Sequence, residues 1–108
     1  MQVTISDLQA YLAQHYSQHG NETALFMKLV EEIGEVAEIL NQRAGRKAHD
    51  NSDLDKELSK EIADVIHYAV ALAAINKLPL TETILEKDKS AAIKYQHSID
   101  LETFLSKE

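Results

Sequence analysis

The sequence predicts an all-α fold, a bundle of four helices in a single domain. Apolar residues recur at intervals of three and four along most of the 108-residue chain, as they do on one face of a helix. Residues that favour helices are abundant, whereas there are only three glycines and one proline. Because a chain this short buries only a modest share of its own surface, we expect a homodimer or a homotetramer to complete the bundle.

Two helices are predicted in the first half of the chain, on either side of Gly20. The first begins near Thr4, which can cap it, carries apolar residues three or four apart as far as Tyr16, and ends near Gly20. The second covers about 21–43, and its apolar residues form one broad stripe. The polar stretch 44–53 has no such period and is predicted to be a loop.

Two further helices are predicted in the second half. The third begins at 52 or 53 and runs to about 76, and apolar residues cover more than half of its circumference. This is typical of a helix in the middle of a bundle or at a subunit interface. Pro79 separates it from a fourth helix at about 80–95, because the residue before a proline disfavours helical dihedrals. We therefore expect a helical domain at 1–95 and a weakly patterned tail at 96–108, part of which could dock as a short helix.

The charge and composition exclude several classes of function. Eighteen acidic residues against 11 basic ones give a net charge of −7, which opposes binding to a phosphate backbone, so we expect no nucleic-acid partner. The absence of cysteine excludes disulfides, thiolate metal sites and cysteine nucleophiles. No apolar run approaches a membrane span and no signal segment is evident, so we expect a cytoplasmic protein without a membrane partner.

Carboxylates lie three residues apart in two of the predicted helices, as Glu32 and Glu35 in the second and Glu61 and Asp64 in the third. Spacing alone is weak evidence, since 18 of 108 residues are acidic and solvated acidic faces are the simpler alternative. However, Glu61 falls inside the apolar stripe of its helix, and acidic side chains are rarely buried unless something neutralises them. Two such pairs on facing helices can converge on a cation. A set of oxygen ligands favours Mg²⁺, with Mn²⁺ as a substitute.

The residues around these four carboxylates bear on the same question. Glu31 and Glu38 are predicted to point further toward solvent. The nearest basic residues, Lys28 and Lys60, are predicted to lie off the apolar faces, where they would not neutralise the carboxylates. Gly34 inside a helix costs about 1 kcal/mol relative to alanine. A neighbouring backbone or a substrate that comes close would explain it.

The two motifs, EEIGE at 31–35 and EIAD at 61–64, resemble the E-E-x-x-E and E-x-x-D signature of the MazG-like nucleotide pyrophosphohydrolases, the all-α NTP pyrophosphatase superfamily. The likeness extends from about residue 8 to residue 95. The resemblance implies that the four carboxylates Glu32, Glu35, Glu61 and Asp64 bind Mg²⁺. It also implies that a metal-activated water attacks a nucleoside triphosphate and releases pyrophosphate. A role in removing unwanted nucleotides is a further implication of the resemblance. Either Glu31 or Glu35 would accept the proton of the water, and the sequence does not choose between them.

Relatives in this family often carry the pattern K-x-x-x-N-x-x-K/R-Y after the second motif. Lys87, Lys94 and Tyr95 fit the pattern, but Ala91 stands where the asparagine would be. The resemblance implies that the two lysines contact phosphate, and exposed lysines without a role are the alternative. Tyr68 is either a residue of the substrate pocket or part of the core.

The sequence also contains three histidine-containing sites that could have a function, and one other class of function is compatible with it. His49-Asp50 is similar to the dyad of HD phosphohydrolases, but the pair lies in a polar loop rather than on a helix. His15 and His19 are four residues apart and could bind zinc, but no third ligand is evident. His67 is predicted to be structural or interfacial. The alternative from another class is a non-catalytic helical dimer that binds a nucleotide or a protein partner.

Overall fold

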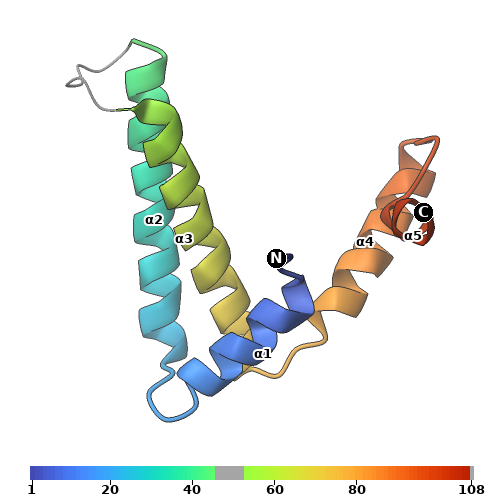
Figure 1. The fold of residues 1–108 in the computed structure, drawn as a ribbon, viewed down its shortest axis with the longest axis horizontal. Coiled ribbons are helices and arrows are strands. Elements are labelled where there is room, and N and C mark those ends of the chain that lie inside the picture. The colour runs from blue at the N-terminus through green and yellow to red at the C-terminus, as the bar shows by residue number, and fades with distance from the viewer. Residues whose placement is uncertain (46–52, 108) are drawn as a thin grey trace.

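The computed structural model describes residues 1–45 and 53–107, and all the regular structure in these residues is helical (Figure 1). The helices are α1 (Ile5–His15), α2 (Glu22–Arg43), α3 (Leu54–Ile75), α4 (Leu80–Lys94) and α5 (Leu101–Ser106). The all-α prediction is confirmed, and the tail contains one short helix. Among the described helices, none combines the length and the hydropathy that a membrane span requires.

The helix starts follow from local sequence. At the beginning of α1, α2, α3 and α5 a cap side chain accepts a hydrogen bond from a backbone N–H of the first turn, namely Thr4, Asn21, Asp53 and Asp100. Such a bond satisfies one of the donors that have no partner within the helix. The fourth helix begins directly after Pro79 without a side-chain cap. These caps keep the starts of α2 and α3 within two residues of the predicted positions.

The first helix ends earlier than predicted, at His15, because the chain must turn onto the end of α3. The amide of Gly20 donates to the carbonyl of Tyr16 at 2.9 Å. A Cβ atom at Gly20 would lie 2.8 Å from that carbonyl oxygen and 2.8 Å from Cγ2 of Ile75. Gly20 is therefore required by close packing in the turn between α1 and α2.

The second and third helices lie side by side as a long antiparallel hairpin, and α1 crosses one end of it (Figure 1). The core lies where these three helices meet and consists of Leu12, Leu25, Val70, Ala71 and Ala74. The side chain of Leu12 is completely buried, and burial of one leucine contributes about 2 kcal/mol. The alanines let α1 and α2 approach α3 closely. The packing thus fixes α2 against α3, the two helices that carry the predicted carboxylates.

An ion pair joins the other ends of these two helices, where Nη2 of Arg43 lies 3.3 Å from Oδ1 of Asp55. Most of the loop predicted at 44–53 falls outside the described residues, as do His49-Asp50 and the alternative helix start at residue 52. The described parts of α2 and α3 nevertheless extend along each other for most of their length.

The fourth helix leans away from the α2–α3 hairpin and contacts α1 and α5 instead (Figure 1). The radius of gyration is 16.9 Å, whereas a compact chain of this length has about 13 Å. The accessible surface is 8263 Å², compared with about 6,000 Å² for a compact monomer of the same length. One copy of the chain therefore leaves much more surface open than its length requires.

The fifth helix packs against α4 through polar contacts. Oδ2 of Asp88 accepts a hydrogen bond from the backbone N–H of Leu101 at 2.6 Å. At the next residue of each helix, Nζ of Lys89 lies 2.7 Å from Oε2 of Glu102. These two contacts anchor the tail to α4.

Candidate metal centre

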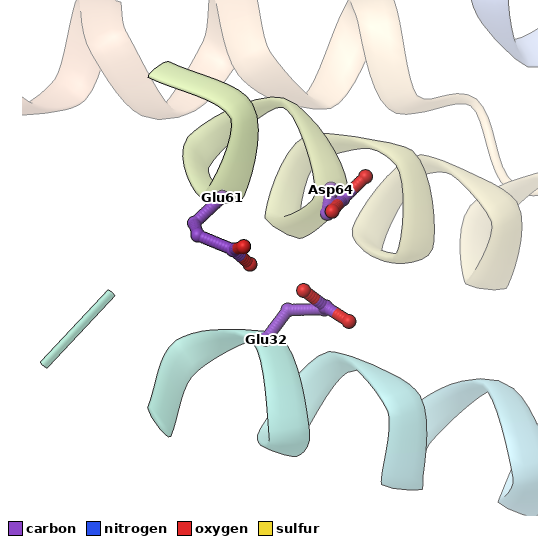
Figure 2. Close-up of side chains that lie close together, drawn as sticks. All are labelled: Glu32, Glu61 and Asp64. Carbon is purple, nitrogen blue, oxygen red and sulfur yellow. The ribbon is translucent and has the colours of Figure 1, made fainter. Parts of the chain in front are cut away.

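Three carboxylates from two helices point into the space between α2 and α3 (Figure 2). They are Glu32 from α2 and Glu61 and Asp64 from α3, and one oxygen of each lies within 4.8 Å of one oxygen of each of the others. Glu61 and Asp64 share a face of α3 because they are three residues apart. The hairpin packing then places Glu32 opposite them. Glu32 and Glu61 are half-buried, whereas Asp64 is exposed.

The Glu61 carboxylate lies among other acidic groups. A hydrogen bond with the Glu32 carboxyl, partial burial and the charges of Glu32, Asp64 and Glu35 raise the pKa of Glu61 from 4.5 to about 7. Its Oε2 atom is buried and has no hydrogen-bond partner. A buried acceptor without a donor costs about 1–3 kcal/mol. Within the described part of the chain, no basic side chain forms a salt bridge with Glu61.

This donor set fits a divalent cation. Hard oxygen ligands are those that Mg²⁺ and Mn²⁺ prefer, and a cation between the three carboxylates would partner the orphaned Oε2 of Glu61. Glu32, Glu61 and Asp64 are therefore the residues that would hold the metal ion.

The other acidic residues predicted near the site lie around this group of three. Glu35 is exposed and does not belong to the group, but it lies near enough for its charge to raise the pKa of Glu61. Glu31 is exposed, and both of its carboxylate oxygens lie 3.4 Å from Nζ of Lys28. Glu38 is half-buried, so the prediction that it points further into solvent was wrong.

Lys28 lies closer to the carboxylates than the sequence predicts. It precedes Glu32 by one turn of α2, and Nζ of Lys28 is 6.0 Å from the centre of the Tyr68 ring on α3. The hydrogen bond with Glu31 raises the pKa of Lys28, and the charge of Glu32 adds to this. The expectation that Lys28 lies off the apolar faces considered only the Cα position, whereas a long flexible side chain reaches across to the neighbouring helix. Its four-residue spacing from Glu32 was the signal in the sequence.

Comparison with known proteins agrees with the fold and with the two motifs. Residues 20–97 match the family model of the MazG nucleotide pyrophosphohydrolase domain. The chain belongs to this family. Both motifs, with all the carboxylates of the site, fall within the matched residues.

Two relatives place this MazG domain among known proteins. The chain is 34% identical to the uncharacterized protein YpjD of Bacillus subtilis (strain 168) over 83 residues. The aligned region covers 73% of this chain and 75% of YpjD. It also resembles the crystal structure of iMazG from Vibrio DAT 722, with a TM-score of 0.61 and 29% identity over 86% of this chain and 98% of that one.

The substrate residues predicted on α4 are not brought to the carboxylates within one copy of the MazG domain. Lys87, Lys94 and Tyr95 line a shallow pocket of about 410 Å³ together with Ala91. Nζ of Lys94 lies 5.3 Å from the centre of the Tyr95 ring. Since α4 leans away from α2 and α3, this pocket and the carboxylates occupy separate parts of the chain (Figure 1). The sequence pattern gives no information on the position of α4 relative to α2 and α3.

The remaining predicted residues lie near the α1–α3 contact. Tyr68 is half-buried and packs against the core. The hydroxyl of Tyr16 and Nε2 of His67 are hydrogen-bonded at 2.7 Å, so His67 joins α3 to α1. His15 and His19 are exposed, with ring centres 5.9 Å apart, and no third metal ligand joins them in the described residues.

Proposed function

We propose that this MazG-domain protein hydrolyses nucleoside triphosphates, ribo or deoxy, to the monophosphate and pyrophosphate in the presence of Mg²⁺. Membership of the family supports the class of reaction. The observation that carries the proposal is the convergence of oxygens from Glu32, Glu61 and Asp64 between two helices. The orphaned Oε2 of Glu61 supports a cation at this position rather than an ordinary acidic surface.

The side chains have separate roles in this proposal. Glu32, Glu61 and Asp64 hold Mg²⁺, or Mn²⁺ in its place, and Glu35 completes the set at its solvent side. A divalent cation there polarises phosphoryl oxygens and lowers the pKa of a bound water. The packed α2–α3 hairpin keeps the carboxylates in position before the substrate arrives.

The contacts also favour one of the two predicted proton acceptors. The Glu31 carboxylate is paired with Lys28, whereas Glu35 has no ion pair in the described part of the chain. We therefore assign Glu35 as the group that accepts the proton of the attacking water.

The open shape supports a homodimer or homotetramer as the active form. The accessible surface exceeds that of a compact monomer by about 2,000 Å², which is in the range that obligate dimers bury. Large apolar side chains of the hairpin are 44% exposed or more, namely Phe26, Val30, Ile33, Leu40, Ile62 and Ile66. In this proposal a second copy covers them and brings Lys87, Lys94 and Tyr95 of its α4 to the carboxylates of the first.

Pyrophosphate release from a panel of canonical and modified NTPs and dNTPs tests the function. We expect release with Mg²⁺ and none with EDTA, and loss of release in Glu35→Gln and Asp64→Asn. Glu57→Gln is the matched control, because Glu57 lies on α3 outside the group and its carboxylate pairs with Lys60 at 3.9 Å. If the wild type leaves every triphosphate intact, the protein is a non-catalytic helical module. A preference for modified nucleotides would support a role in clearing them from the nucleotide pool.

A further inference from the structure

One basic side chain stands beside the carboxylates without a strong partner. Lys28 precedes Glu32 by four residues on α2, a rise of about 6 Å along the helix axis. On the facing helix Tyr68 follows Asp64 by four residues, and Nζ of Lys28 lies 6.0 Å from its ring centre. The backbone of Lys28 is therefore one helical turn from Glu32, on the side nearer α1, and its ammonium group lies between Glu31 and the Tyr68 ring.

The only ion pair that Lys28 forms in the described residues is weak. Both oxygens of Glu31 are 3.4 Å from Nζ, longer than a good charged hydrogen bond. The side chains of Lys28 and Glu31 are 45% and 57% exposed, and exposed pairs of this kind contribute little to stability. Lys28 can leave Glu31 for a more highly charged anion at little cost.

A triphosphate at this site needs such a cation. The chain carries a net charge of −7, and the three carboxylates face the same space. Two other basic residues of the hairpin are paired elsewhere, since Lys60 pairs with Glu57 and Arg43 pairs with Asp55 at the far end. Within one copy, Lys28 is thus the cation that α2 presents next to the carboxylates.

We infer that Lys28 is a phosphate-binding residue, which exchanges Glu31 for the triphosphate chain and positions it beside Glu32, Glu61 and Asp64. This inference rests on the proposed function, because it assumes that polyphosphate binds at the carboxylates. The Tyr68 ring supports the lysine side chain from α3 in this arrangement. Lysine suits the task because it contacts phosphate as a point charge and needs no fixed orientation.

Binding of inorganic tripolyphosphate with Mg²⁺, measured by calorimetry, tests the inference without knowledge of the base. Lys28→Met should raise the Kd by about 10-fold to 100-fold, the effect of losing one charged hydrogen bond. Lys28→Arg should stay near the wild type, and Lys60→Met is the control that should not change the Kd. The rise in melting temperature caused by Mg²⁺ alone should be the same in all four proteins, because Lys28 does not hold the metal.

Each outcome separates this inference from the proposed function. If Lys28→Met binds tripolyphosphate as tightly as the wild type, or if the wild type does not bind it, the inference is overturned. If Lys28→Met also loses the effect of Mg²⁺ on the melting temperature, Lys28 is structural and the inference is again overturned. If tripolyphosphate binding depends on Lys28 while no nucleotide is hydrolysed, the inference about Lys28 is supported and the proposed catalytic function is contradicted.

Discussion

Glu61 is the side chain whose surroundings depend most on a bound cation. It is half-buried, its Oε2 atom has no donor, and Glu32 and Asp64 lie within 4.8 Å of it. Carboxylates in such contact repel one another unless a proton or a metal ion lies between them. The hydrogen bond with Glu32, partial burial and this repulsion raise the pKa of Glu61, and a bound proton or the proposed Mg²⁺ would each relieve the repulsion.

Glu61→Gln, which replaces one carboxylate oxygen by an amide nitrogen, tests whether Glu61 binds a cation. Pyrophosphate release should fall by about 100-fold or more, the usual effect of removing one charged group from such a site. The metal-free variant should be at least as stable as the wild type, because a neutral amide no longer repels Glu32 and Asp64. Melting curves with and without Mg²⁺ measure this, and only the wild type and the Glu57→Gln control should gain stability from Mg²⁺. A full response to Mg²⁺ in Glu61→Gln would exclude Glu61 as a ligand.

The sequence predicted the carboxylates that the structure brings together, but not the nearby position of the Lys28 side chain. Glu32, Glu61 and Asp64 were predicted from their spacing, from the place of Glu61 on an apolar stripe and from the family resemblance, and the structure brings their carboxylates together. Glu35 shares the spacing but stays outside the group, because spacing fixes a direction around the helix and not the reach of a side chain. Lys28 was missed for the same reason. Its contact with Tyr68 depends on four rotatable bonds and on the neighbouring helix.

Replacement by alanine should have opposite effects on stability at Gly34, inside α2, and at Gly20, in the turn before α2. A Cβ atom at Gly34 would meet no other atom within 4 Å, whereas one at Gly20 would lie 2.8 Å from backbone and side-chain atoms. Gly34→Ala should therefore raise the free energy of unfolding by about 0.5–1 kcal/mol. Gly20→Ala should lower it. Urea unfolding of both variants measures this, and a destabilised Gly34→Ala would show that another copy packs against that face of α2.

The docking of α5 on α4 depends on Asp88 and Lys89. Asp88→Ala removes the acceptor of the Leu101 amide and should release the tail while the rest of the fold persists. Hydrogen exchange should then show lost protection in 101–106, with little change in α2 and α3. Glu86→Ala is the control, because Glu86 is exposed and lies two residues before Asp88, on the opposite side of α4. Unchanged protection of 101–106 would mean that the apolar residues of α5 hold it without Asp88.

The same helices show which elements a sequence can predict. The starts of α2, α3 and α4 follow from caps and from Pro79, which are local features, and they were predicted within two residues. The short tail has few apolar residues, so its pattern is weak, and polar contacts with α4 that no apolar period reveals help to anchor α5. The early end of α1 depends on the approach of Gly20 to Ile75, a contact between residues far apart in the chain.

The open arrangement of the helices is the property that local patterns could not predict. Apolar periods show which face of a helix is buried, but not whether the same chain or another one buries it. The hairpin and α4 therefore separate in one copy, with a radius of gyration of 16.9 Å and exposed apolar residues along α2 and α3. A second copy would close the structure that the sequence predicts as a bundle.

Mixing of two inactive variants tests whether copies share a site. Chains with Glu61→Gln and chains with both Lys87→Ala and Lys94→Ala should each be inactive alone. Unfolded together and refolded, they should regain pyrophosphate release, because mixed assemblies contain one site with intact carboxylates and intact lysines. Glu61→Gln mixed with Asp64→Asn should stay inactive, since both changes lie in the same group. No recovery in the first mixture would mean that α4 does not act across copies.

Diffraction from crystals soaked in Mn²⁺, recorded at the manganese absorption edge, tests the central claim most directly. We expect one or more anomalous peaks bonded to oxygens of Glu32, Glu61 and Asp64, with metal–oxygen distances of roughly 2.0–2.2 Å. Crystals of Glu61→Gln should lose the peak. Should the wild-type carboxylates instead carry no manganese, or be neutralised by lysines or arginines of a second copy, the metal site and the hydrolytic function built on it would be contradicted.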